Sequence, residues 1–218
     1  MKKKESKPQK QPQESYHHGD LRNMLLLRSE AILEEKGVQG LSLRDVASDL
    51  GVSHSAPYRH FPNKLDLLFA LATRGFSDLR DAMNKAWEEN ESAIEKLNAA
   101  GSAYIHLVLR HPRRTELMFG GEVNCGEAPP EELLQVGKEA YMGLYRIVEF
   151  GRMGKVFRND LPTESLAMSV WSAVHGFAVI NERDWRLTKT EEERETMKKQ
   201  MSSLFEILVH GIRDQSVK

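Results

Sequence analysis

Ser-Leu-Arg-Asp-Val-Ala-Ser-Asp-Leu-Gly-Val-Ser-His-Ser-Ala-Pro-Tyr-Arg-His-Phe, residues 42–61, has the pattern of two short helices joined by one tight turn. Ser42 can cap the first helix, and Asp45 three positions later completes a capping-box pattern. Gly51 ends this helix where a left-handed backbone is wanted, which glycine adopts without steric cost. Ser53 is then placed to cap a second helix. One apolar face at helical spacing supports the first helix: Leu43, Val46, Ala47 and Leu50. The stretch therefore predicts a helix-turn-helix, whose second helix would enter a DNA major groove.

The residues after the turn are more specific than the helix pair, which many all-α proteins share. The run Gly-Val-Ser-His-Ser-Ala-Pro-Tyr-Arg-His-Phe-Pro-Asn-Lys-Leu-Asp-Leu-Leu (51–68) resembles the DNA-binding signature of the TetR (tetracycline-repressor) family of bacterial transcription regulators. In that family an aromatic-rich end of the recognition helix is followed by Phe, a short turn and a Lys that starts the next helix. The resemblance covers about residues 20–72, and the matching residues are Tyr58, His60, Phe61 and Lys64.

The resemblance implies an all-α protein with an N-terminal three-helix helix-turn-helix domain and a larger C-terminal helical domain for ligand binding and dimerisation. We expect a disordered basic tail at 1–15, because it has five lysines and no large apolar residue after Met1. The DNA-binding domain is expected at 16–72 and the ligand-binding and dimerisation domain at 73–218. Apolar spacing and breaker residues predict about nine helices: near 20–36, 42–50, 53–61, 64–87, 92–110, 113–119, 131–150, 163–181 and 190–212.

Composition agrees with a DNA-binding protein but supports it weakly. The 218 residues suffice for one or two domains, and the formal net charge is −1. Residues 1–75 carry a net charge of +3 and the remainder −4, a modest asymmetry. A single Cys suits a reducing cytoplasm, and no apolar run approaches the ~18 residues of a membrane span. We expect a cytoplasmic protein.

Pro57 sets the second helix apart from the family pattern. Its side chain keeps the apolar character expected at this position, but it has no backbone N–H to donate. Proline costs little in the first turn of a helix, where the N–H groups are free anyway. We expect a short or slightly distorted recognition helix that is not broken.

The resemblance and helix-turn-helix docking together assign roles to this segment. His54, Ser55 and Ala56 lie near the start of the recognition helix, the part that meets base edges. Tyr58 and Lys64 are better placed for phosphate oxygens, which set register without reading sequence. For each residue the alternative is an ordinary solvated surface position. The full candidate set for DNA contact is Ser42, Arg44, Ser53, His54, Ser55, Ala56, Tyr58, Arg59, His60 and Lys64.

A small-molecule pocket is expected in the C-terminal half, where aromatic and Met residues with polar tips gather. Such residues also build ordinary helical cores, so both interpretations stay open. Trp171 and His175 share a helix face, and the pattern Trp-x-x-x-His-Gly (171–176) looks like one in the ligand-binding half of a TetR subgroup. The candidate pocket residues are Tyr104, Met118, Phe119, Tyr141, Tyr145, Trp171 and His175.

Catalytic, metal and cofactor motifs are lacking from the sequence. It has no Gly-x-Ser-x-Gly, no His-Glu-x-x-His and neither common Gly-rich phosphate-binding motif. Cys125 has no basic residue close in sequence, which favours a bystander thiol. We expect no enzyme activity, no metal site and no cofactor. An enzyme with an incidental helix-turn-helix is the less favoured alternative.

The last two helices are expected to form a homodimer interface, as the resemblance implies. The final helix carries an apolar stripe that includes Leu204 and Leu208. Dimers also suit helix-turn-helix proteins, because one unit reads few bases. The sequence thus predicts a homodimeric regulator, a repressor released from a pseudo-palindromic operator by a small molecule. The alternative keeps the helix-turn-helix but makes the C-terminal domain a protein-interaction or architectural module without inducer.

Overall fold

The computed structural model describes residues 18–121, 123, 128–187 and 190–214, and these are helical throughout apart from turns, connecting segments and one isolated β-bridge. The expected basic tail at 1–15 and Cys125 lie outside the described residues. The all-α prediction is confirmed, and the described part holds eight α-helices and one 3-10 helix. They are α1 (His18–Gly40), α2 (Leu43–Asp49), η1 (Pro57–Arg59), α3 (Lys64–Glu88), α4 (Ala93–Arg110), α5 (Pro112–Phe119), α6 (Glu131–Met153), α7 (Thr163–Leu187) and α8 (Glu191–Ile212).

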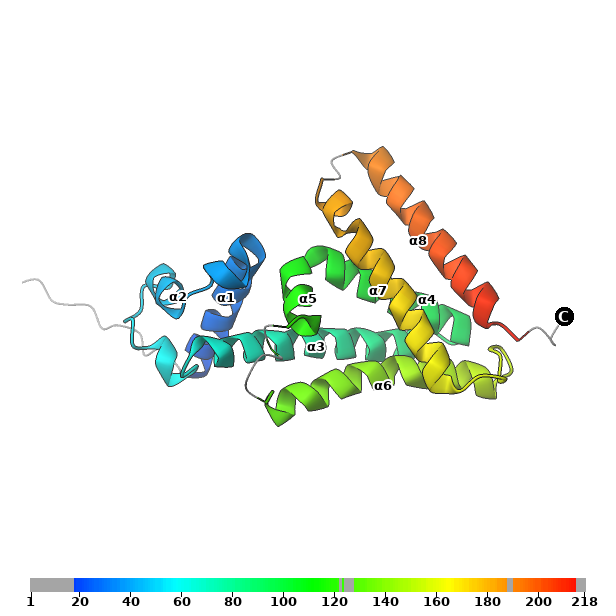
Figure 1. Cartoon of the computed structure of the whole chain (residues 1–218), viewed down its shortest axis with the longest axis horizontal. Coiled ribbons are helices and arrows are strands. Elements are labelled where there is room, and N and C mark those ends of the chain that lie inside the picture. The colour runs from blue at the N-terminus through cyan, green and yellow to red at the C-terminus, as the bar shows by residue number, and fades with distance from the viewer. Residues whose placement is uncertain (1–17, 122, 124–127, 188–189, 215–218) are drawn as a thin grey trace, which may run out of the picture.

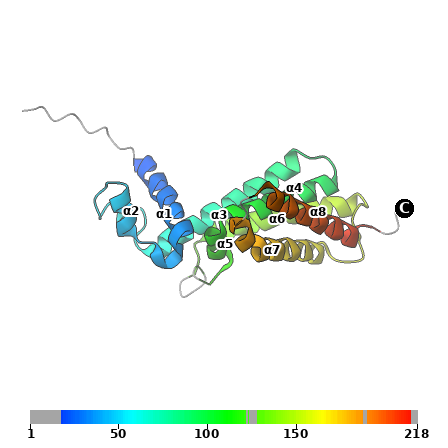
Figure 2. The ribbon, with the colours of Figure 1, turned by 90° about the horizontal axis from the view of Figure 1, so that it is seen from above.

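The molecule is elongated along α3, with α1, α2 and η1 at one end and α7 and α8 toward the other (Figures 1 and 2). α6 packs along α3, and α4 packs against both α3 and α7. One apolar core runs through both ends, because buried side chains of α1, α2, α3, α4, α6 and α7 form a single cluster. None of the described helices is both long and apolar enough to span a bilayer.

Two glycines have left-handed backbones: Gly37, at a kink inside α1, and Gly51, just after α2. Gly37 has φ 69° and Gly51 has φ 66°, conformations that side chains rarely tolerate. Ser42 occupies the N-cap of α2, but its side chain makes no capping hydrogen bond, so the predicted capping box with Asp45 is wrong in detail. Backbone bonds close the turn instead, since the N–H of Val52 donates to the Ala47 carbonyl over 3.0 Å.

Capping boxes form at three later helices. Asn63 and Asp66 cap α3, Ser92 and Glu95 cap α4, and Thr190 and Glu193 cap α8. The run Thr-Glu-Glu-Glu at 190–193 carries this pattern in the sequence itself. Each box satisfies backbone N–H groups that would otherwise lack partners at a helix start, so the helix boundaries are set locally.

A buried ion cluster joins the two ends of the molecule. The Arg114 side chain is 2% exposed, and its Nη1 lies 2.6 Å from a carboxylate oxygen of Glu30 in α1 and 2.9 Å from one of Asp78 in α3. Glu34, one turn after Glu30, accepts hydrogen bonds from the backbone N–H groups of Arg113 (3.1 Å) and Arg114 (3.0 Å). The start of α5 is therefore fixed to α1, because a buried guanidinium needs its carboxylate partners.

Glu30→Gln is expected to lower the free energy of unfolding by about 3 kcal/mol, because it leaves the buried Arg114 with one carboxylate partner fewer. Urea denaturation followed by circular dichroism measures the change. Glu35→Gln is the matched control: Glu35 is exposed, lies on the same helix, and should change stability by less than about 0.5 kcal/mol. Equal stabilities for the two variants would show that the cluster does not hold α5 to α1.

Candidate functional site

The recognition segment is a turn followed by one 3-10 turn, not an α-helix. Pro57 is its first helical residue, as expected from its lack of an N–H, and it is buried. The residue before the helix is Ala56, so the prediction that Ser53 caps it is wrong. Ser53 instead accepts the N–H of Ala56 at its carbonyl over 2.9 Å. The predicted helix at 53–61 is therefore wrong in extent, since only Pro57–Arg59 is helical. Pro57 has no N–H to donate to the Ser53 carbonyl, so an α-helix cannot start at Ser53.

Most of the predicted DNA-contact residues lie on the exposed surface of α2, the turn and η1. Arg44 and Arg59 are exposed and form no ion pair with any described residue, so both guanidinium groups are free for a ligand. Tyr58 is 44% exposed. Three further exposed positions are Ser53, His54 and Ser55, whereas Ser42, Ala56, His60 and Lys64 are half-buried.

Lys64 has a structural partner that sequence reasoning missed. Its ammonium donates a hydrogen bond to the backbone carbonyl of Val38 over 2.6 Å. That carbonyl follows the kink at Gly37, where the helical bond pattern is broken. An ammonium carries three donors, so this bond leaves capacity for a phosphate oxygen. This bond holds the side chain against the end of α1.

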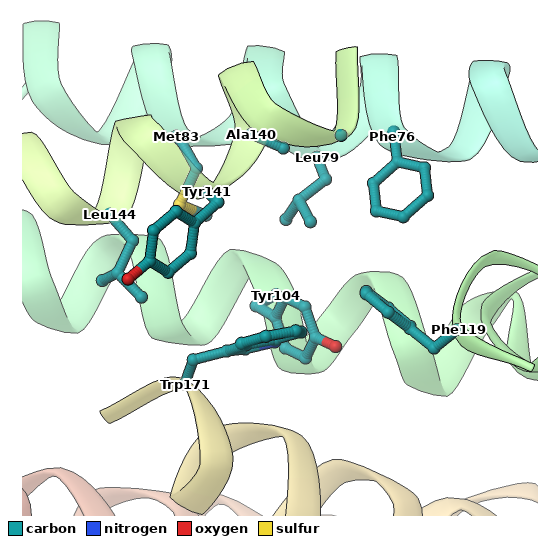
Figure 3. A pocket seen from close by; sticks show the side chains of 10 residues that line it. Phe76, Leu79, Met83, Tyr104, Phe119, Ala140, Tyr141, Leu144 and Trp171 are labelled. Carbon is teal, nitrogen blue, oxygen red and sulfur yellow. The ribbon is translucent and has the colours of Figure 1, made fainter. Parts of the chain in front are cut away.

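A cavity of about 70 Å³ lies between α3, α4, α6 and α7, with α5 at one end (Figure 3). Its walls are almost wholly apolar and aromatic. In Figure 3 the Tyr141 hydroxyl lies at the Leu144 end and the Tyr104 hydroxyl points toward Phe119. The lining residues are Phe76, Leu79, Met83, Tyr104, Phe119, Gly137, Ala140, Tyr141, Leu144 and Trp171.

The structure brings together four of the seven predicted pocket residues: Tyr104, Phe119, Tyr141 and Trp171. Met118 is buried against α3 at Gly75 and does not line the cavity. Tyr145 faces a surface groove between α3 and α6 instead. His175 lines a neighbouring, wider cleft of about 450 Å³, which shares Phe119 with the cavity.

Sequence reasoning missed the walls that α3 and α6 contribute. Phe76, Leu79 and Met83 belong to the apolar stripe of α3, and Ala140 and Leu144 to that of α6. Their spacing showed that they face inward, but spacing does not distinguish a cavity wall from a filled core.

Tyr104 and His175 form the polar contact at the edge of the cavity. The Tyr104 hydroxyl lies 2.6 Å from His175 Nδ1. Burial raises the pKa of Tyr104 to about 12, and a hydrogen bond with Trp171 opposes part of that rise. Burial also lowers the pKa of His175, so its imidazole is neutral near pH 7 and can accept a hydrogen bond from the Tyr104 O–H at Nδ1. Both groups are therefore uncharged near pH 7.

Exposed apolar side chains mark the outer faces of α7 and α8. On these helices Ile180 is 78% exposed, Ile207 71% and Val179 50%. The predicted interface residues Leu204 and Leu208 are half-buried and pack against the chain's own core. The last two helices thus present an apolar surface, but through residues that the sequence analysis did not select.

Two family models match this chain over most of its length. Residues 25–71 match "Bacterial regulatory proteins, tetR family", and residues 97–204 match "Tetracyclin repressor-like, C-terminal domain". The first covers most of α1 through η1 and the start of α3, and the second covers the helices that surround the cavity from α4 onward.

Individual proteins agree with the family models. A solved structure of a protein with unknown function from Rhodococcus sp. RHA1 has a TM-score of 0.77 and 30% identity, covering 92% of this chain and all of that one. The HTH-type transcriptional regulator Rv1816 of Mycobacterium tuberculosis is 29% identical over 121 residues, 55% of this chain and 52% of that protein. The HTH-type transcriptional repressor KstR of the same species is 26% identical over 117 residues, 54% of this chain and 53% of KstR. The chain thus aligns with about half the length of these curated relatives.

We expect His175→Gln to flatten the dependence of stability on pH. Because burial lowers the His175 pKa below its ordinary 6.5, the unfolded chain binds the proton more readily than the folded one. The contribution of neutral His175 to the wild-type free energy of unfolding is therefore complete above about pH 6.5. It is lost as the pH drops toward the lowered pKa of the folded state. Gln keeps an acceptor for Tyr104 but does not titrate.

Urea unfolding at several pH values between about 7.5 and 5.5 measures this slope. His111, whose pKa burial also lowers, leaves a smaller residual slope in the variant. The same slope in wild type and variant would contradict the buried, neutral state of His175.

Proposed function

Because the chain belongs to the TetR family of bacterial regulatory proteins, we propose that it is a sequence-specific DNA-binding transcriptional regulator. In this proposal it is a cytoplasmic homodimeric repressor, released from a pseudo-palindromic operator by a small molecule. The name of the relative KstR, a transcriptional repressor, supports the sign of regulation. No catalytic step is part of the proposal.

The observation that carries the proposal is the exposed surface of α2 and η1, on which Arg44 and Arg59 form no ion pair with any described residue. The free guanidinium groups of Arg44 and Arg59 supply charge for phosphates. His54 and Ser55, exposed just before η1, are the proposed base readers. A half-buried Ala56 leaves little side chain to reach a base, so it ranks below these two.

The proposed division places DNA binding at 16–72 and ligand binding with dimerisation at 73–218. This boundary falls inside α3, which is continuous from Lys64 to Glu88. A continuous helix carries a tilt from one part to the other, which supports α3 as one mechanical link. The family models, which end at 71 and begin at 97, support the same division.

α5 is a second link between the proposed domains. Phe119, at its last turn, lines the cavity, whereas Arg113 and Arg114, at its first turn, are bonded to Glu34 of α1. A ligand that displaces the Phe119 ring would shift an eight-residue helix whose other end is fixed to α1. We propose that a ligand in the cavity shifts the position of α1 in this way. The coupling free energy between ligand binding and DNA binding would be ~1–3 kcal/mol, as is typical of allosteric proteins.

Arg44→Ala is expected to weaken binding to all DNA sequences and to reduce the slope of log affinity against log salt by about 0.9, the value for one lost phosphate contact. Fluorescence anisotropy with an operator recovered by genomic pull-down, across a KCl series, measures the slope. Arg28→Ala is the control, because Arg28 in α1 is already paired with Asp49 of α2 at 2.6 Å. An unchanged slope for Arg44→Ala would remove α2 from the DNA interface.

Ile180→Asp is expected to produce monomers, because an unpaired charge in an apolar helix interface costs several kcal/mol. Met153→Asp is the matched control: Met153 is also 78% exposed but lies on α6. Analytical ultracentrifugation measures the oligomeric state of both. Monomers from Met153→Asp and dimers from Ile180→Asp would move the interface from α7 and α8 to α6.

A further inference from the structure

The Tyr141 hydroxyl is a buried polar group without a partner. Its oxygen is shielded from solvent and makes no hydrogen bond with any described residue. Buried polar atoms in native proteins nearly always have a partner, so an orphan requires an explanation. The tyrosine lines the cavity, and its hydroxyl lies at the Leu144 end (Figure 3). A group entering the cavity can therefore supply the missing partner.

Water is a poor candidate for that partner. About 70 Å³ is enough space for a water molecule, but a buried water needs two to four polar partners. The Tyr104 hydroxyl is already bonded to His175. Among the described lining residues, Tyr141 carries the one buried side-chain polar atom without a hydrogen-bond partner. A single partner does not hold a water in an otherwise apolar space.

The charge of the walls restricts what can enter. No described lining residue is charged, so an ion in the cavity would be buried without a counter-charge. Burial raises the pKa of the Tyr141 phenol, and the negative charge of Glu164 adds to that rise. The same carboxylate would repel an anion placed at this hydroxyl. The phenol therefore stays protonated and acts as a neutral donor.

We infer that the cavity takes the neutral, apolar part of a ligand, with one hydrogen-bond acceptor, such as a ketone or ester carbonyl, placed against the Tyr141 hydroxyl. This inference rests on the proposed ligand-responsive function and specifies the ligand class. The cavity is smaller than the ~150 Å³ that holds benzene, so a larger ligand must displace a wall. Phe119, which separates it from the wider cleft at His175, is the wall that both spaces share.

Matched six-membered-ring probes test the inference. Cyclohexanone carries the acceptor, methylcyclohexane lacks it, and cyclohexanecarboxylate and cyclohexylammonium carry opposite charges. The full-length protein is titrated with each probe, and NMR follows the resonance of the Trp171 indole N–H. The Trp171→Phe variant assigns this resonance, because it lacks it. Cyclohexanone is expected to bind most tightly of the four.

Tyr141→Phe should weaken cyclohexanone binding by about two- to tenfold, the range for one net hydrogen bond. It should leave methylcyclohexane binding unchanged or stronger. The variant should also be no less stable than wild type, because it removes an unpaired polar atom. Tyr145→Phe, on the same helix but outside the cavity, is the control and should change neither affinity.

Three outcomes would overturn the inference. They are equal losses for the ketone and the hydrocarbon in Tyr141→Phe, tighter binding of either ion than of cyclohexanone, and no binding of cyclohexanone up to its solubility limit. Operator binding by the same preparations separates the two levels of failure. If the protein binds operator but gives any of these outcomes, only the inferred ligand class is wrong. If the wild-type protein does not bind operator, the proposed function itself is wrong.

Discussion

The buried guanidinium of Arg114 is the constraint on which the arrangement of this molecule depends. A charge that is 2% exposed is tolerated only beside carboxylates, and these come from Glu30 in α1 and Asp78 in α3. Arg114, in α5, thus needs α1 and α3 in place at the same time. Glu34 adds two bonds to the backbone at the start of α5, where free N–H groups need acceptors. The N-terminal helices are held to the rest of the molecule through this cluster as well as through the continuous α3.

This arrangement places a short rigid element between two sites of different chemistry. One end of α5 is charged and bound to α1, and the other end carries the aromatic ring of Phe119 into the cavity. The exposed cations of α2 and η1 suit an anionic partner, whereas the cavity has only apolar walls and one free hydroxyl. Packed helices transmit a displacement because well-packed interiors deform little. The proposed regulator therefore has two routes from ligand to DNA, along α3 and through α5.

Local sequence signals were reliable where one residue's own conformation or bonding capacity decides the outcome. Gly51 has a left-handed backbone, Thr190 opens α8 with a capping box, and Pro57 begins its helix. Two expectations about side-chain bonding failed. Ser42 caps α2 by position but makes no side-chain capping bond, and Lys64 is bonded to the Val38 carbonyl of a helix 26 positions earlier. The Lys64 bond cannot be read from local spacing, because its partner is far away in the chain.

The sequence by itself determined the all-α class, the places where most of the helices begin and the resemblance carried by residues 51–68, because periodicity, caps and breakers act over a few residues. Tertiary structure alone decided which inward-facing residues border empty space and which outward-facing ones stay uncovered. Tyr104 and Trp171 line the cavity while Met118 fills the core, although all three were expected in one pocket. Ile180 and Ile207 remain exposed while Leu204 is half-buried. The physical reason is that a cavity or an exposed face depends on the relative positions of several helices, which no single helix specifies.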